Sequence, residues 1–287
     1  MFRTRFAPSP TGFLHEGHAL AAMKAFCAAE EAGGECLLRI EDIDQTRCRP
    51  EFERAIYEDL SWLGFSWPEP VRRQSDHFSD YEVVLAQLKS MGLVYRSFLS
   101  RKEIAADLMA SDVGLSPAGE YPYPGPLHSM SEDEEEARLD AGDAFSWRLS
   151  LARCRDYLGT EYERLSFIEL WAGPDGQRGE IAASPHWLGD VILARKDTPT
   201  SYHLAVTHDD ALQEITHIVR GQDLFHSTHI HVLLQRLLGW PTPEYCHHHL
   251  LFGPDGKKLS KSAGSATLRS LKDEGATADE LRRRWNA

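Results

Sequence analysis

The chain has 287 residues, of which 42% are hydrophobic and 26% charged, and its 31 basic and 44 acidic side chains give a formal charge of −13. This composition is typical of a globular protein with a full core, and it excludes a disordered chain. The acidity excludes a general polyanion binder, so any RNA must bind through a local basic face and in a salt-sensitive way.

The sequence predicts neither a secretory signal nor a membrane span. The opening Met1–Arg5 is not an apolar run, and no stretch of about 18 apolar residues follows it. The five cysteines are scattered and contain no Cys-x-x-Cys pair, which indicates reduced thiols rather than disulfides or a zinc ribbon. We therefore expect a soluble cytoplasmic protein that makes no membrane contact.

The first third of the chain alternates strands and helices. Residues 3–7 predict a strand, 17–31 an amphipathic helix and 36–40 a second, buried strand. Further helices are predicted over about 50–63 and 79–90. Such alternation is typical of a parallel sheet with right-handed crossovers, whose ligand crevice lies at the carboxyl ends of the strands.

The pattern changes between about residues 95 and 185. Gly/Pro-rich and acidic stretches there predict an inserted α+β module, in which Glu132–Glu136 form the first turn of a helix capped by Ser131. Alternation then returns. The elements predicted beyond the module are strands over 191–194, 202–206 and 215–219, a turn over 209–212, and helices over 227–238 and 278–285.

We therefore predict an α/β fold with a Rossmann-like parallel sheet that is interrupted by a smaller α+β insertion. The chain divides into a first half of the Rossmann-like domain (1–95), the inserted module (96–185), the second half (186–265) and a short helical tail (266–287).

One motif near the N-terminus predicts a phosphate site. A strand ends in the Pro-rich loop 7–12, and a helix begins at about Gly17. His15 and His18 place imidazole donors at this turn, where the helix dipole favours negative charge. Gly17 leaves room for a flat base to approach the backbone.

A second motif lies near the C-terminus. Lys258 and Lys261 stand three residues apart on a glycine-flanked loop, in the stretch Lys-Leu-Ser-Lys-Ser. Two mobile cations of this kind suit the developing charge of a polyphosphate leaving group.

Four ordered motifs carry a family resemblance: RFAPSPTG at 5–12, HEGH at 15–18, LRIEDID at 38–44 and KLSKS at 258–262. Together they resemble the class I aminoacyl-tRNA synthetases of the glutamyl branch, over about residues 3–265. The resemblance implies that the enzyme uses ATP with Mg²⁺ to convert glutamate into glutamyl-adenylate, and that the inserted module is similar to an acceptor-binding module.

The resemblance also implies roles for single residues. The implied catalytic residues are His15, His18, Lys258 and Lys261, and the implied nucleotide contacts are His15, Gly17, His18 and Lys261. The implied glutamate contacts are Arg5, Ser9, Glu41, Tyr202 and Arg220. From the residues alone, a structural ion pair between Arg5 and Glu41 and a core position for Tyr202 are alternatives.

The chain departs from the full synthetases after the lysine loop, where it lacks the expected anticodon-binding domain. It therefore resembles their shortened paralogues, the glutamyl-Q tRNA(Asp) synthetases, and the apolar Val206, where full synthetases typically carry Asn, supports this. That family transfers glutamate to queuosine in the anticodon loop of tRNA(Asp). The implied partners are glutamate, ATP and queuosine-containing tRNA(Asp), and we expect a monomer.

Three alternatives stay open. The chain could be a minimal glutamyl-tRNA synthetase that charges the 3′ end of tRNA, a non-catalytic tRNA or amino-acid binding module, or another nucleotidyl transferase of the superfamily. The intact histidines and lysines argue against the binding module, because binding alone does not need both phosphate contacts.

We expect no metal site. Shortened paralogues often hold one zinc in the inserted module, but Ser97, Leu99 and Leu127 stand where thiolates would be, while Tyr123 remains. Apolar packing of Leu99 and Leu127 is expected instead. The run 247–249 is all histidine, but alternate side chains of a strand face opposite ways, so it predicts a strand rather than a metal site.

Overall fold

The computed structural model describes residues 1–109, 114–117, 119, 121–123, 125, 130–252 and 266–286. The strands are β1 (Arg3–Phe6), β2 (Glu35–Ile40), β3 (Arg72–Arg73), β4 (Val94–Ser97), β5 (Ser146–Leu149), β6 (Ser166–Glu169), β7 (Gly179–Ala182), β8 (Ile192–Arg195), β9 (His217–Gly221) and β10 (Glu244–His248). The helices are α1 (Glu16–Glu31), α2 (Pro50–Trp62), α3 (Phe78–Ser90), α4 (Arg101–Met109), α5 (Glu132–Asp140), α6 (Leu151–Leu158), α7 (Tyr202–Leu212), α8 (Ser227–Leu238), α9 (Leu268–Asp273) and α10 (Ala278–Asn286).

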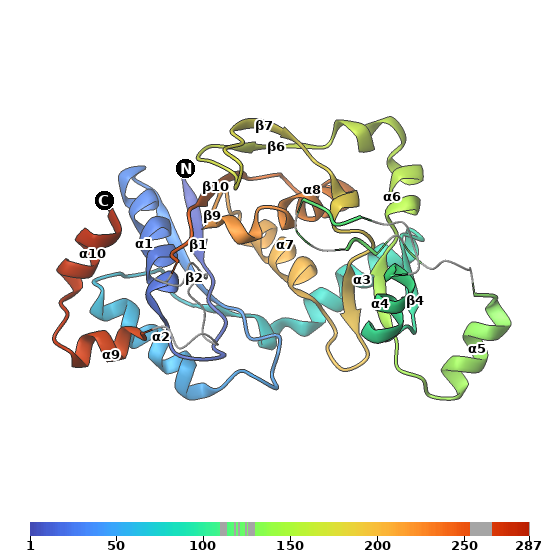
Figure 1. Ribbon diagram of the computed structural model, residues 1–287, viewed down its shortest axis with the longest axis horizontal. Coiled ribbons are helices and arrows are strands. Elements are labelled where there is room, and N and C mark those ends of the chain that lie inside the picture. The colour runs from blue at the N-terminus through green and yellow to red at the C-terminus, as the bar shows by residue number, and fades with distance from the viewer. Residues whose placement is uncertain are drawn as a thin grey trace.

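Parallel strands form the centre of the molecule (Figure 1). One sheet has the order β1-β2-β3 with parallel pairing, and a second has the order β7-β6-β10-β9, in which β6, β10 and β9 are parallel. The Thr216 N–H, one residue before β9, donates to the Arg3 carbonyl at 2.9 Å, so β9 lies beside β1. This arrangement confirms the predicted Rossmann-like parallel sheet.

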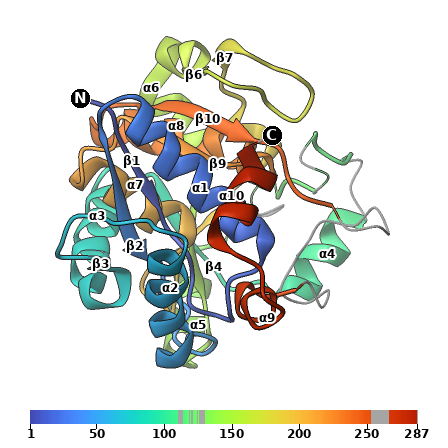
Figure 2. The ribbon, with the colours of Figure 1, turned by 90° about the vertical axis from the view of Figure 1, so that its left-hand side faces the viewer.

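The helix α1 packs closely on β1 because it is rich in alanine. Its buried positions alternate small and large side chains, from Ala19 and Leu20 to Ala25 and Phe26. The returning chain passes so close that a Cβ on Gly34 would lie 2.0 Å from the Phe2 carbonyl oxygen, which only glycine tolerates. The tail returns to this region, where α10 lies beside α1 (Figure 2).

The inserted region is built around an antiparallel sheet with the order β4-β5-β8. Strands from before and after the predicted boundary at residue 185 pair with one another, because β6 pairs with β10 and β5 pairs with β8. The division into segments therefore stays a prediction. One buried apolar cluster extends across the same boundary, and it includes Leu85, Leu149, Leu193, Leu204 and Leu233.

A polar cluster around Asp190 ties the inserted region together. The Asp190 carboxylate accepts from the Tyr95 hydroxyl and the Leu151 N–H, each at 2.9 Å. The backbone N–H of Asp190 donates to the Tyr123 carbonyl. The Arg148 guanidinium stacks 4.6 Å from the centre of the Tyr123 ring. Leu127 lies outside the described residues, so its packing stays a prediction.

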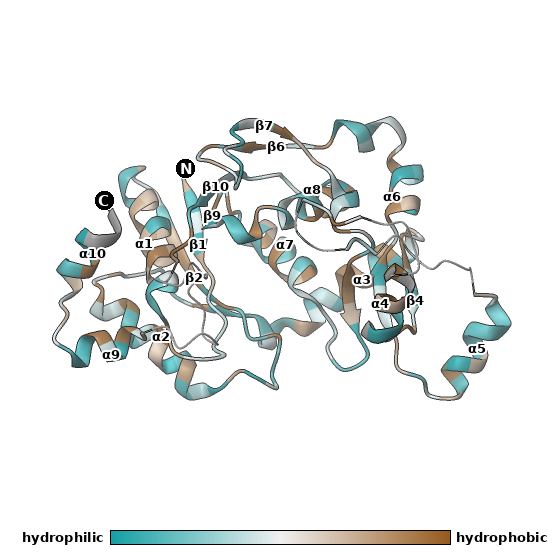
Figure 3. Cartoon of the chain, in the orientation of Figure 1, coloured by the Kyte–Doolittle hydropathy of each residue, from teal (hydrophilic) through white to brown (hydrophobic). Residues whose placement is uncertain are grey.

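The five helices predicted with bounds are confirmed within one residue at each end, and one predicted strand is wrong. Helix α8 has the predicted bounds, and Ser131 caps α5, whose mainly hydrophilic residues are teal in Figure 3. Residues 202–206 and 209–212, predicted as a strand and a turn, form the single helix α7. None of the helices in the described ranges is long and apolar enough to cross a membrane.

Buried ion pairs explain why residues 202–212 form the helix α7, although their local sequence favours a strand and a turn. Tyr and Val favour strands, and two adjacent aspartates favour a turn. Asp209 and Asp210 are instead buried, and they pair with Arg5 of β1, Arg39 of β2 and Arg72 of β3. These pairs require both carboxylates on one turn of a helix that faces the sheet.

Asp209→Asn should destabilise the protein strongly. Each Asp209 oxygen accepts two hydrogen bonds, from Arg72 and His208 on one side and from Gln74 and Tyr81 on the other. An amide would turn an NH₂ group toward two of these donors, and this should cost about 3–5 kcal/mol of unfolding free energy, measured by urea denaturation at pH 7.

The same variant has a pH signature. Burial raises the pKa of Asp209, but the His208 hydrogen bond and the charges of Arg39 and Arg72 outweigh it and lower the pKa to about 2. The stability that Asp209 supplies is therefore present above its unfolded pKa of about 3.9 and is lost as the pH falls toward 2. The difference in unfolding free energy between the variant and the wild type should therefore decrease below about pH 4. Asp44→Asn, in an exposed turn, is the control, and an equal loss there would contradict the argument.

Candidate functional site

A pocket of about 680 Å³ lies at the carboxyl ends of β1, β2 and β9. This is where an open parallel sheet holds its ligand. The predicted site residues that line it are Arg5, Ser9, His15, Gly17, His18, Glu41, Tyr202 and Arg220. The fold thus gathers every described site residue into one pocket, although they span more than two hundred positions. Lys258 and Lys261 lie outside the described residues.

Both ends of the lysine stretch nevertheless lie at this pocket. On the upstream side, Leu250 and Leu251 line it. On the downstream side, Thr267 forms an antiparallel bridge with His15, and the Leu268 N–H donates to the Leu14 carbonyl at 2.8 Å. The chain that carries the two lysines therefore leaves and re-enters the described structure beside the histidine motif.

His15 and His18 cap α1 with their side chains. The Gly17 N–H donates to His15 Nδ1 at 3.1 Å, and the His15 N–H donates to His18 Nδ1 at 3.3 Å. Since both Nδ1 atoms accept, the ring proton of each histidine lies on Nε2. A Cβ on Gly17 would lie 3.0 Å from the His15 ring, so glycine here makes room for that ring. The cap thus orients two imidazole donors at a positive helix terminus.

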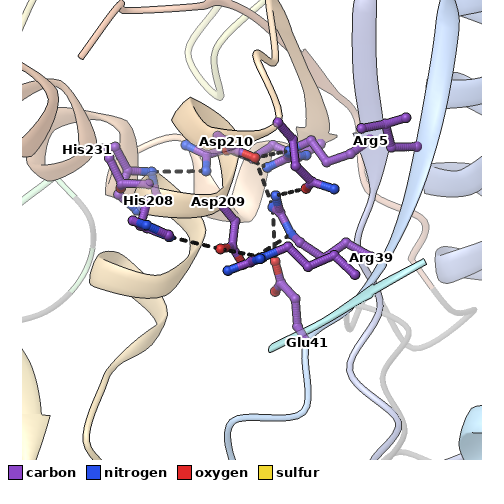
Figure 4. A network of polar contacts seen from close by, with 12 residues as sticks. Arg5, Arg39, Glu41, His208, Asp209, Asp210 and His231 are labelled. Atoms are coloured by element: carbon purple, nitrogen blue, oxygen red, sulfur yellow. Dashed lines mark hydrogen bonds and ion pairs between the residues drawn. The ribbon is translucent and has the colours of Figure 1, made fainter. Parts of the chain in front are cut away.

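The ion pair of Arg5 differs from the one considered from the sequence. Its partner is Asp210 of α7, with Nε 2.8 Å from Oδ1 and Nη2 3.3 Å from Oδ2, rather than Glu41 (Figure 4). Arg39 Nη2 donates to the same Oδ1 at 2.8 Å. The pairing uses one edge of the Arg5 guanidinium and leaves Arg5 at the wall of the pocket.

Glu41 is one of the two acidic residues that line the pocket, and Asp223 is the other. Its carboxylate lies 3.4 Å from Arg39 Nη2. Burial raises the pKa of Glu41 above its usual range, although the charges of Arg39 and Arg5 oppose the shift. A cationic group of a ligand would restore the ionised form, so this end of the pocket suits an ammonium group.

Arg220 is the unusual cation. Its side chain is buried, yet in the described ranges no carboxylate lies within ion-pair distance of it. Its guanidinium donates to neutral groups: His247 Nε2, the Tyr202 hydroxyl, His231 Nδ1 and Thr228 Oγ1, at 2.7 to 3.3 Å. A buried charge without a counter-ion is costly, so the pocket favours an anionic ligand at Arg220.

Sequence reasoning missed the residues behind the pocket wall. Asp210, Arg39, Glu169 and His247 are all buried and polar. Arg39 could have been found, because a guanidinium in an apolar strand needs a partner, which is the argument already applied to Arg5. Asp210 and Glu169 carried no local signal, and the histidine run 247–249 was interpreted only as a strand. Within the described part of the chain, no group of His, Cys, Asp or Glu is arranged to hold a metal ion.

His15 substitutions should separate capping from ligand binding. His15→Asn should keep the cap, because its side-chain oxygen can accept from the Gly17 N–H, whereas His15→Ala should lose about 1 kcal/mol of unfolding free energy. Both variants lack the Nε2 donor, so both should weaken ATP binding to a similar extent in calorimetric titration. If His15→Ala weakened ATP binding and the more stable His15→Asn did not, the assignment of His15 Nε2 as a donor to ATP would be wrong.

Comparisons with known proteins show the family of the chain. Residues 1–283 match the family described as tRNA synthetases class I (E and Q), catalytic domain. The glutamyl-Q tRNA(Asp) synthetase of Rhodobacter capsulatus is 43% identical over 98% of both chains, and that of Symbiobacterium thermophilum is 38% identical over 96% of this chain and 83% of its own.

A solved structure extends the comparison to the fold. The glutamate tRNA ligase of Elizabethkingia meningosepticum, in complex with its amino acid, superposes with a TM-score of 0.71 at 29% identity. The match covers 96% of this chain and 53% of the ligase, so the chain spans about half the length of that structure. On the strength of the family match and these relatives, the chain belongs to the class I tRNA synthetases of the E and Q group, within their catalytic domain.

Proposed function

We propose that the protein activates glutamate with ATP and transfers it to queuosine of tRNA(Asp). The observation that carries the amino-acid part is Arg220, a buried guanidinium with neutral partners at the wall of the pocket. The relatives in Rhodobacter and Symbiobacterium, named for glutamyl-Q tRNA(Asp) synthesis, support the tRNA part.

The pocket suits glutamate because its lining includes the acidic Glu41 and the basic Arg5 and Arg220 at separate places. Glu41 would meet the ammonium group, and Arg5, Ser9 and Arg220 would meet carboxylate oxygens. Tyr202 begins α7, and its hydroxyl lies 3.3 Å from Arg220 Nη1, which places it to complete the same contact. A neutral glutamine side chain would leave the Arg220 charge without a counter-ion, so the site should select glutamate.

The first chemical step joins an oxygen of the glutamate α-carboxylate to the α-phosphorus of ATP, while the bond to the β-phosphate oxygen breaks and pyrophosphate leaves. The Nε2 protons of His15 and His18 would stabilise the negative charge that develops on the phosphates. Lys258 and Lys261 would act from the other side, and Mg²⁺ carried by ATP would supply further positive charge. Positioning and charge stabilisation can carry this step, so no protein nucleophile is needed.

The second step moves the acyl group. A hydroxyl of the cyclopentene diol of queuosine attacks the glutamyl carbonyl, AMP leaves with its phosphate, and the hydroxyl proton passes to that phosphate or to water. The product is an ester on the anticodon loop. A minimal glutamyl-tRNA synthetase would run the same first step and differ only in the hydroxyl that attacks.

A labelling experiment separates these two acceptors. We expect ATP and labelled glutamate to label tRNA(Asp) that contains queuosine, but neither queuosine-free tRNA(Asp) nor tRNA(Glu). Removal of the 3′-terminal adenosine from the queuosine-containing tRNA should leave the labelling intact, because the acceptor hydroxyl is elsewhere. Label on tRNA(Glu), or its loss with the terminal adenosine, would instead establish charging of the 3′ end.

The role of Glu41 predicts a pH dependence of glutamate binding. An ammonium group beside Glu41 lowers a pKa that burial has raised, so binding favours the deprotonated carboxylate. The KM for glutamate should therefore fall as the pH rises through the raised pKa and should level off above it. Measurements of pyrophosphate exchange between about pH 5 and 8 keep both carboxylates of free glutamate ionised.

Glu41→Gln provides the matched control. It should raise the KM for glutamate throughout and abolish this pH dependence, because Gln does not titrate. A variant that kept the wild-type pH profile would show that another group titrates, and the assignment of Glu41 to the ammonium group would then fall.

A further inference from the structure

A buried row of polar side chains crosses three neighbouring parallel strands and ends at Arg220. Glu169 closes β6, His247 lies in β10 and Arg220 in β9, in a sheet whose order is β6-β10-β9. His247 and Arg220 are register partners. Glu169 and His247 are 0% and 1% exposed, so both are withdrawn from solvent behind the pocket.

Along this row, Arg220 donates to His247, and His247 donates to Glu169. Arg220 Nε can only donate, and it does so to His247 Nε2 at 3.1 Å. His247 Nδ1 must then carry the ring proton, and it lies 2.5 Å from Glu169 Oε2. Burial lowers the pKa of His247 to about 4, although the hydrogen bond to Glu169 opposes the shift, so the ring is neutral at pH 7.

The Glu169 carboxylate is itself fixed. Its other oxygen accepts from the backbone N–H groups of Trp171, at 3.1 Å, and of His247, at 3.0 Å. The carboxylate thus receives three N–H groups and cannot turn without losing at least two of them. It presents a stationary acceptor to the imidazole of His247.

We propose that Glu169 and His247 are positioning residues that orient Arg220 toward the carboxylate of the glutamate substrate. The imidazole of His247 lies between Glu169 and Arg220 and accepts from Arg220 Nε, which fixes that edge of the guanidinium. Glu169 contacts only the other nitrogen of the ring, so its carboxylate does not neutralise the guanidinium. The charge of Arg220 thereby stays available to the ligand. This inference rests on the proposed function, since it takes glutamate as the ligand.

The contrast with Arg5 supports this role. Arg5 pairs directly with Asp210 through two hydrogen bonds, and Asp210 also takes Arg39. Had Glu169 contacted Arg220 in the same way, the pocket would have lost its uncompensated cation. A neutral imidazole linker provides orientation without neutralisation, as a histidine does between a carboxylate and a metal.

Two substitutions of His247 test the orientation. In His247→Gln, the side-chain oxygen can take the place of Nε2 and accept from Arg220 Nε. In His247→Asn, the amide reaches only the place of Nδ1, so Glu169 keeps its donor but Arg220 loses its acceptor. The KM for glutamate should rise roughly 10- to 100-fold in the Asn variant, with the KM for ATP unchanged, and the Gln variant should recover most of the wild-type value.

Glu169→Gln tests the acid by a different route. The Gln oxygen should stay with the two backbone N–H groups, which turns its NH₂ toward His247 Nδ1. The imidazole must then carry its proton on Nε2, against the Arg220 donor. Glutamate KM should rise while ATP KM holds, and ¹⁵N NMR of the His247 ring should show the proton moved from Nδ1 in the wild type to Nε2 in the variant.

His229→Asn is the control for the loss of stability that the substitution of any buried histidine causes. His229 is equally buried, and its Nδ1 accepts from the Ser184 N–H rather than from Arg220. It should lower the melting temperature without raising the KM for glutamate. Equal glutamate KM values in the Asn and Gln variants of His247, or a wild-type ring protonated on Nε2, would overturn the inference while leaving the proposed function intact. A wild type without glutamate-dependent pyrophosphate exchange would overturn both.

Discussion

The fold depends on a buried set of ion pairs between the central helix α7 and the first sheet. Asp209 and Asp210 receive Arg5, Arg39 and Arg72 from three adjacent strands. Arg39 is fully buried, and an isolated guanidinium there would cost several kcal/mol, so this position of Arg39 depends on the carboxylates of α7. The same contacts place the N-terminus of α7, and hence Tyr202, at the pocket.

Arg5 and Arg220, two of the arginines that line the pocket, consequently have different electrostatic surroundings. Arg5 has its charge balanced by Asp210, so its contribution is mainly shape and hydrogen bonding along its remaining edge. Arg220 donates to His247, and no carboxylate of the described residues lies within ion-pair distance of its guanidinium. A ligand carboxylate gains most where the counter-ion is missing, because the desolvation of that cation was already paid on folding.

Much of the site could be predicted from the sequence because its residues lie next to local signals. Ser9 and His15 follow a strand and precede a helix, and Glu41 follows the next strand, so topology alone brings them to one edge. The shape of α7 could not be predicted, because the partners of its aspartates lie far away in the chain. For the same reason the structural ion pair considered for Arg5 was with Glu41 rather than with the distant Asp210.

The described structure also places the two ends of the chain that flank the lysine stretch. Its upstream end at Leu251 lines the pocket, and its downstream end at Thr267 is held by pairing with His15. The segment that carries Lys258 and Lys261 lies outside the described residues, and it is flanked by the pocket on one side and by His15 on the other. The helices α9 and α10 follow the downstream flank and anchor it, since α10 lies against α1. The tail thus helps to hold Thr267 beside His15, in the motif that we propose to bind phosphate.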